Sequence, residues 1–165
     1  LVKTSNKSSG ELQDQKIGDR PVYEVMGGMC ESWGADSIGK YGYSAVGAVV
    51  GATHREQGEK LRKEHPHMFF LVPGYGAQGA TAEDVAGFFD ENGLGAIINS
   101  SRGITAAYKK DASFTEEEYA KAAREAALRM KEQLNEALKI TYKRRQYKKW
   151  QKNLYMRLRC LQMKR

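Results

Sequence analysis

Short apolar runs alternate with amphipathic or charged segments along residues 1–138. The runs are apolar almost throughout, with little alternation with polar residues, which is typical of strands buried on both faces of a parallel sheet. Repeated units of strand, loop and helix predict an α/β architecture. The predicted strands cover residues 1–4, 45–50, 68–72 and 96–99.

The segments between these runs predict helices. A weak helix is expected over residues 22–33, interrupted by Gly27-Gly28, because paired glycines disfavour helix. A charged helix is expected over residues 55–64, where the following His-Pro-His stops it. Thr81 is a favourable residue before the first turn of a further helix.

The clearest predicted helix comes last in the regular part of the chain. Thr115 and Glu118 have the spacing of a capping box, which marks a helix start. Apolar residues then follow at helical spacing and predict packing against the outside of a sheet. This apolar stripe consists of Tyr119, Ala123, Ala126, Met130, Leu134 and Leu138.

Charge divides the chain after Leu138. The formal net charge is +7, but 11 of the 27 Lys and Arg lie in residues 139–165, which contain no acidic residue. The rest holds 16 basic and 20 acidic residues and is mildly acidic. We therefore predict two parts, residues 1–138 and a basic tail of residues 139–165 that is disordered or out of frame.

The tail has two interpretations. Its basic residues alternate with aromatics, and such a pattern can neutralise phosphates and stack bases of RNA or DNA. The other interpretation, which we favour, is an out-of-frame or read-through product of an incomplete gene sequence. A nucleic-acid partner is expected only if the first interpretation of the tail holds.

Composition excludes several classes of protein. No apolar run is long enough to span a membrane, and the first residues do not resemble a secretory leader. Cys30 and Cys160 lie far apart, so neither a disulfide scaffold nor a zinc site is indicated. The three histidines, His54, His65 and His67, have no ligand partners at suitable spacing. A reducing cytoplasm fits these features.

A glycine-rich turn follows the third predicted strand. Residues 73–79 read Pro-Gly-Tyr-Gly-Ala-Gln-Gly and contain the pattern G-x-G-x-x-G. One interpretation is dinucleotide binding, but the acidic residue expected about 20 positions later is absent, because the next strand ends at Asn99. The other is a plain glycine-rich turn.

Two further strand ends carry polar groups. The sequence Asn99-Ser100-Ser101-Arg102-Gly103 combines small residues for close backbone approach with a guanidinium, which suits a single phosphate. Two such consecutive loops match the phosphate site of (β/α)8 barrels. Taken alone, Arg102 has a second and less favoured interpretation as a solvated loop residue. The first strand end offers Thr4, Ser5 and Asn6, residues that more often cap turns.

Together these motifs resemble one enzyme family. The segments at residues 1–6, 46–53, 70–79 and 99–103 follow in order the pattern of orotidine 5'-phosphate decarboxylase, in its bacterial type 2 subfamily. The resemblance covers residues 1–138 and implies the C-terminal half of a (β/α)8 TIM barrel, strands five to eight. It implies a carboxy-lyase that converts orotidine 5'-monophosphate (OMP) to uridine 5'-monophosphate (UMP) and CO2 in pyrimidine biosynthesis, without metal or cofactor.

The resemblance also assigns substrate-binding roles. Arg102 and the backbone of Ser101 would hold the substrate phosphate, and Ser5 would donate or accept a hydrogen bond at the pyrimidine. Gln78, on a mobile loop that begins at Pro73, would bridge phosphate and pyrimidine. The proton-donating lysine of the family sits in a D-x-K-x-x-D motif on an earlier strand, and we expect no such motif in this sequence. No catalytic residue is therefore assigned, and this chain alone is expected to be inactive.

Association is expected as well. The resemblance implies a homodimer for the intact enzyme, with no membrane partner. A half barrel leaves open strand edges and apolar faces, so the chain is expected to be unstable or to self-associate. The alternative function is a non-catalytic nucleic-acid-binding adaptor that uses the basic tail.

Overall fold

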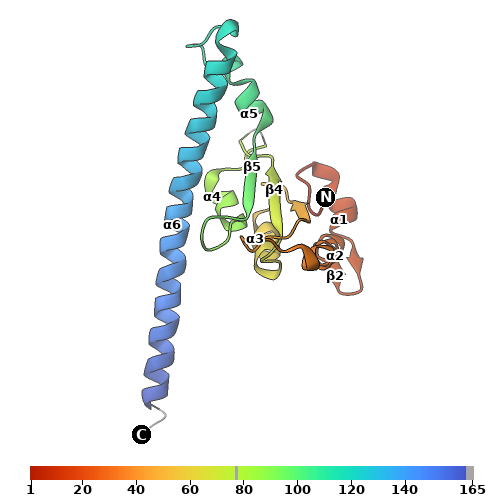
Figure 1. Ribbon diagram of the computed structural model, residues 1–165, viewed down its shortest axis with the longest axis vertical. Helices are drawn as coiled ribbons and strands as arrows, with labels where there is room; N and C mark the ends of the chain where they lie inside the picture. Colours follow the sequence, from red (N-terminus) through yellow and green to blue (C-terminus); the bar gives the residue numbers. More distant parts are fainter. Residues whose placement is uncertain (77, 163–165) are drawn as a thin grey trace.

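A parallel sheet lies at the centre of the molecule (Figure 1). The computed structural model describes residues 1–76 and 78–162, and the side chains of residues 140 and 142–162 are outside this description. The sheet has the order β3-β4-β5 with parallel pairing throughout, as the apolar runs predict. Lys3 adds an isolated parallel bridge to Val50, so the first predicted strand lies beside β3. The strands are β3 (Gly47–Val49), β4 (Phe69–Pro73) and β5 (Ala96–Asn99).

Helices follow the strands, so the α/β prediction is confirmed. α3 has the predicted bounds, because Glu56 lies in its first turn, Arg62 and Lys63 lie in its last turn, and the helix stops before Pro66. Thr81 accepts from the backbone N–H of Asp84 and caps α4 as expected. The helices are α1 (Gly10–Gln13), α2 (Val22–Gly34), α3 (Arg55–Glu64), α4 (Ala82–Val85), α5 (Ser101–Thr105) and α6 (Tyr119–Gln162), and short 3₁₀ turns comprise η1 (Lys7–Ser9), η2 (Ala35–Ser37), η3 (Ala86–Phe88), η4 (Ala107–Lys109) and η5 (Glu116–Glu118).

The expected interruption of α2 is wrong, because the helix runs unbroken through Gly27-Gly28. Gly27 faces α3, and a Cβ at this position would lie 2.8 Å from Leu61 Cδ2 and 3.0 Å from His65 Nε2. The missing side chain therefore lets the two helices approach closely, and packing outweighs the low helix propensity of glycine.

The segment after the first strand is more ordered than its polar sequence predicts. It forms η1, α1 and an antiparallel pair, β1 (Lys16–Ile17) with β2 (Arg20–Pro21). Lys3 is buried, and its Nζ lies 2.6 Å from Asp14 Oδ1 at the end of α1. These elements are too short to show a hydrophobic period, so the sequence predicts only a loop.

α6 begins where the sequence predicts. The capping box of Thr115 and Glu118 is present, although its first turn is the 3₁₀ turn η5. Met130, Leu134 and Leu138 pack against the core, whereas Tyr119 at the start of the predicted stripe is exposed. The helix continues past Leu138, and the division into residues 1–138 and 139–165 stays a prediction. None of the described helices has the length and apolar character that a membrane span requires.

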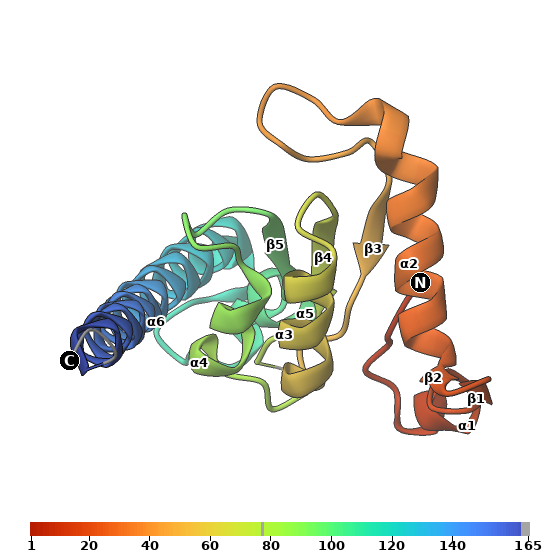
Figure 2. The same ribbon diagram turned by 90° about the horizontal axis from the view of Figure 1, so that it is seen from below.

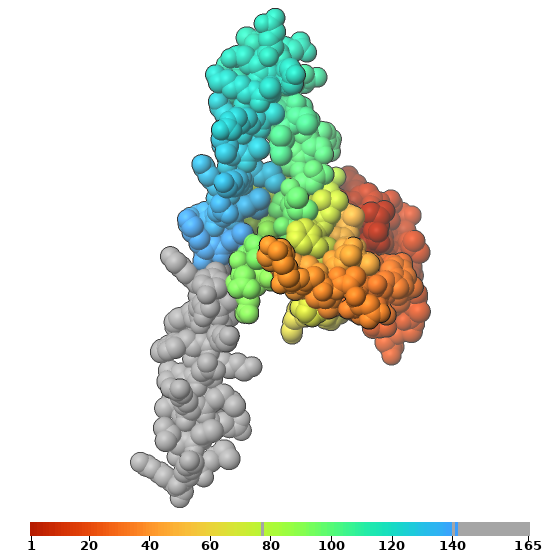
Figure 3. All heavy atoms as spheres, in the orientation of Figure 1, coloured from red at the N-terminus to blue at the C-terminus, as the bar shows by residue number. Residues whose placement is uncertain are grey.

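The two faces of the sheet have different environments. α3 and α4 lie on one side of the strands (Figure 2) and cover Ala48, Val50, Phe70 and Val72, which are buried. Within the described residues no helix covers the opposite face. That open face carries Phe69, Leu71 and Ile97, which are exposed by 39%, 42% and 56%. α5 and the first turns of α6 lie side by side and extend beyond the sheet (Figure 3).

Candidate functional site

Three of the predicted substrate-binding positions converge at the carboxyl ends of the strands. A Cβ at Gly74 would lie 2.8 Å from Gln78 Oε1 and 3.2 Å from Ser5 Oγ, so both side chains point at this glycine. Pro73, the last residue of β4, pairs with Asn99 of β5. Ser5 and Gln78 are far apart in sequence, and their proximity to Gly74 is consistent with a shared binding site.

Gly74 has a φ of +100°, which only glycine adopts without strain. The turn beyond it is closed by two backbone hydrogen bonds, from Gly76 N to Ala80 O at 2.9 Å and from Gly79 N to Gly76 O at 3.0 Å. Ala77 is outside the described residues. The loop therefore has a defined base at Gly74 and a closed turn beyond it.

Tyr75 fixes this loop to the last helix. Its ring is buried, and its hydroxyl donates to Gln133 Oε1 of α6 at 2.9 Å. Burial, together with the negative charge of Glu83, raises the pKa of the Tyr75 hydroxyl. The phenol thus stays protonated near neutral pH and acts as a hydrogen-bond donor.

Ser100 joins the loops after β4 and β5. Its buried hydroxyl donates to the backbone carbonyl of Tyr75 at 2.9 Å. Gly103 packs against the same side chain, because a Cβ there would lie 2.4 Å from Ser100 Oγ. The two loops that the sequence analysis assigns to phosphate binding are therefore physically linked.

Ser101 and Arg102 occupy the first turn of α5, immediately after Ser100. Both side chains are exposed, and Asn99 Nδ2 approaches Ser101 Oγ at 3.4 Å. The side chain of Arg102 makes no hydrogen bond or ion pair with any other described residue. An exposed guanidinium with unused donors beside a glycine-rich loop can bind an anion such as a phosphate monoester.

Two supporting side chains were missed in the sequence analysis. His54 Nε2 lies 2.8 Å from the carbonyl oxygen of Thr4, and Gln13 Oε1 accepts from the Thr4 backbone N–H at 2.9 Å. Both hold the strand end that carries Ser5. The position of His54, four residues after a predicted strand, was the available signal for its contact, whereas nothing in the pattern around Gln13 indicates one.

The expectation that the D-x-K-x-x-D motif is absent is wrong, because Asp14, Lys16 and Asp19 have this spacing. Lys16 lies on the exposed hairpin strand β1, and Asp14 is already paired with Lys3. All three residues of the stretch are exposed. The stretch does not form the buried lysine and aspartate array that proton transfer requires.

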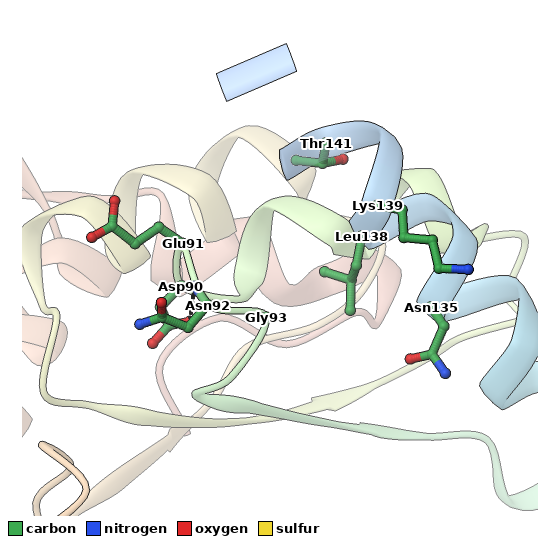
Figure 4. Close-up of a pocket in the computed structure, with 8 residues that line it drawn as sticks. All are labelled: Asp90, Glu91, Asn92, Gly93, Asn135, Leu138, Lys139 and Thr141. Atoms are coloured by element: carbon green, nitrogen blue, oxygen red, sulfur yellow. Dashed lines mark hydrogen bonds between the residues drawn. The ribbon is translucent and has the colours of Figure 1, made fainter. Parts of the chain in front are cut away.

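The hollow in Figure 4 lies at the other end of the sheet. It has a volume of about 570 Å³ and is bounded by Asp90, Glu91 and Asn92 before β5 and by Asn135, Leu138 and Lys139 of α6. Binding sites of parallel α/β folds lie at the carboxyl ends of the strands, so this position does not support a substrate site. Within the described part of the chain, no group of three or more His, Cys, Asp or Glu could hold a metal ion.

Comparisons with known proteins find relatives of one name. The chain is 45% identical over 140 residues to an orotidine 5'-phosphate decarboxylase of Clostridium tetani, covering 84% of this chain and 47% of the relative. It is 45% identical over 138 residues to the enzyme of the same name from Caldicellulosiruptor bescii, covering 84% of this chain and 44% of the relative. A scan against protein-family models finds no match.

A solved structure gives the same result. An orotidine-monophosphate decarboxylase of Toxoplasma gondii superposes with a TM-score of 0.65 and 31% identity, covering 84% of this chain and 50% of that one. Such relatives imply a TIM-barrel fold. This chain spans about half the length of the curated relatives it matches. Over 84% of its length, the chain is a homologue of orotidine 5'-phosphate decarboxylase.

Proposed function

We propose that this chain is the substrate-binding part of an orotidine 5'-phosphate decarboxylase, built from strands five to eight of the (β/α)8 barrel. The bond from Ser100 Oγ to the Tyr75 carbonyl carries the proposal, because it joins the two loops at the carboxyl ends of β4 and β5. The order of the parallel strands supports the assignment, since it follows the chain without interruption. The reaction belongs to cytoplasmic pyrimidine biosynthesis, and the bacterial type 2 subfamily and its homodimer are part of the proposal.

Residues at the site have distinct roles in this proposal. Arg102 and the backbone N–H of Ser101 bind the phosphate of OMP. Gln78 lies between phosphate and pyrimidine, on the loop that starts at Pro73, and Ser5 hydrogen-bonds the pyrimidine. The convergence of Ser5 and Gln78 on Gly74 supports this arrangement.

The contribution to catalysis is indirect. Binding of a phosphate remote from the reacting carbon can be used to close a loop and exclude water, which lowers the barrier to loss of CO2. The proton that replaces CO2 comes from a lysine of the family motif, and no described residue of this chain is placed to supply it. We therefore propose that the chain binds OMP and UMP but does not decarboxylate alone.

The tail is excluded from the proposal. We keep the proposed boundary at Leu138 on the change in charge, since residues 139–165 contain 11 basic residues and no acidic residue. Apart from Lys139 and Thr141, the side chains of residues 139–165 lie outside the described residues. The comparisons do not support the nucleic-acid-binding adaptor, and it is not proposed.

Calorimetric titration of the purified chain with UMP tests the proposal. We expect Arg102→Ala to weaken UMP binding by about 10- to 100-fold, because a charge-assisted contact to the phosphate is lost. Arg55→Ala is a matched control, since Arg55 is also an exposed arginine in the first turn of a helix after a strand. Equal affinities of the two variants would contradict the assignment of Arg102.

A second assay measures whether the chain decarboxylates OMP. The chain alone should give no loss of OMP absorbance, whereas mixing it with the remaining part of the Clostridium tetani relative should restore turnover. Turnover by the isolated chain would overturn the proposal that the proton donor lies elsewhere. Failure of the mixture, with Arg102-dependent UMP binding intact, would contradict only the half-barrel assignment.

A further inference from the structure

The open face of the sheet is an apolar surface without charge. Side chains alternate between the two faces along each strand, so the side chains on this face point away from the buried ones. A groove of about 340 Å³ runs across it, next to Leu1 and beside Phe69 and Leu71. Parallel sheets are otherwise found covered on both faces. The residues of the open face are Gly47, Val49, Phe69, Leu71, Ile97 and Asn99.

Both outer edges of the sheet are also unpaired. Within the described residues, β5 pairs only with β4, and the segment around Lys3 bridges only to β3. Natural edges are blunted by charged residues, proline or bulges. β5 reads Ala-Ile-Ile-Asn and has none of these, and the charge of Lys3 is turned inward to Asp14. Both edges can therefore accept a further parallel strand.

We propose that a second copy of this chain docks on the open face and closes an eight-stranded barrel around a two-fold axis. Each copy supplies four parallel segments in sequential order. The free edge of β5 in one copy pairs with the segment at residues 1–4 of the other, and the reverse pairing closes the ring. The proposal rests on the half-barrel part of the proposed function, and because UMP binding and dimerisation are measured separately, the failure of one is distinguishable from the failure of the other.

Strand number and charge favour a second copy as the occupant. Barrels of eight strands have an interior that side chains just fill, so two sets of four segments match it in number and direction. A two-fold axis brings the same patch of both copies together. Because the six residues of the open face carry no charge, this contact has no like-charge repulsion. The closed ring pairs every edge and buries Phe69, Leu71 and Ile97.

Sedimentation velocity of the full 165-residue chain over a range of concentrations tests the proposal. We expect a dimer, and we expect Ile97→Glu to weaken it by at least about 100-fold, because a carboxylate would be buried in an apolar interior. Leu12→Glu is the matched control and should leave the dimer intact. Leu12 is exposed by 68%, similar to Ile97, but lies on α1 outside the open face.

Hydrogen exchange of the unaltered chain provides a readout that does not depend on how the variants fold. Backbone amides of Ala96–Asn99 should become more protected as concentration rises through the dimerisation range. A monomer at all concentrations, a ladder of larger aggregates, or a dimer unaffected by Ile97→Glu would each overturn the proposal. The last result would show that another surface, such as α6, holds the copies together.

Discussion

Two arginines near opposite ends of β5 differ in burial, and this difference distinguishes a side chain that stabilises the fold from one that is available to bind a ligand. Arg62 is buried, with its guanidinium 3.9 Å above the Phe70 ring, and donates to the carbonyls of Phe88 at 2.8 Å and Gly95 at 2.7 Å. Arg102 is exposed and has no such partner among the described residues. A guanidinium whose donors are already used has little left for a ligand. The first arginine therefore supports the fold, and the second is available for an anion.

Replacing Arg62 should give the largest loss of stability. Arg62→Met would leave the buried carbonyl of Phe88 without the Arg62 donor and the Gly95 carbonyl with the backbone N–H of Phe70 alone, and we expect the free energy of unfolding to fall by about 3 kcal/mol. Arg62→Lys should recover little, because an ammonium lacks the planar fork and the stacking. Urea denaturation followed by circular dichroism measures both. A loss for Arg62→Met smaller than about 1 kcal/mol would contradict this role.

Gly74→Ala should have the next largest effect. A Cβ at φ +100° would strain the backbone and meet Gln78 and Ser5. We expect a loss of about 1–3 kcal/mol in unfolding free energy, together with weaker UMP binding. Gly28→Ala is the control, because it lies in α2 with open space around it and should stabilise by about 0.5–1 kcal/mol. Unchanged UMP affinity in Gly74→Ala would remove this loop from the site.

Acid should weaken the contacts of Asp90, whose carboxylate also attracts the charge of Arg62. Burial acts to raise the pKa of Asp90, but hydrogen bonds from Tyr43 and from the backbone of Leu94 and Asn92 hold it below its ordinary value of 3.8. A carboxylate with a lowered pKa stabilises the fold above its ordinary pKa, and this stability is lost as pH falls through the lowered value. Thermal melts should show a smaller loss at acid pH for Asp90→Asn. An identical acid dependence would contradict it.

Arg102→Ala should change stability least. An exposed side chain without a protein partner contributes little, so we expect the unfolding free energy to stay within about 0.5 kcal/mol. The same variant should lose UMP affinity, which is the reverse of the expectation for Arg62. A large loss of stability in this variant would mean that the comparison between the two arginines fails.

The regular elements were predictable because the strands are continuous apolar runs and the helix between two of them is a charged segment with turn signals at its ends. The strands at 69–73 and 96–99 and the helix at 55–64 are examples, since each is bounded by Pro, Gly or polar residues. The hairpin of β1 and β2 was not predictable, because its two-residue strands are held by local backbone pairing and by the Lys3–Asp14 pair. Local contacts between elements as short as these leave no periodic signal in the sequence.

The candidate site was predictable in residue type but not in geometry. The motifs at residues 73–79 and 99–103 identify Gln78, Ser101 and Arg102, and the resemblance supplies their roles. The sequence does not indicate that Ser100, rather than Ser101, links the loops, because the direction of a serine hydroxyl depends on the tertiary fold. Gly27 is a second case in which the tertiary fold decides, since its packing against Leu61 and His65 outweighs its low helix propensity.

The hydrogen bond between Tyr75 and Gln133 couples the stability of α6 to the order of the loop. Coupling between two sites is reciprocal, so a ligand that orders the loop through Tyr75 must stabilise α6 by the same free energy with which α6 favours that ligand. Slower amide exchange along α6 on addition of UMP would measure this coupling from the side of the helix. The last helix then reports on occupancy of a site that it does not itself line.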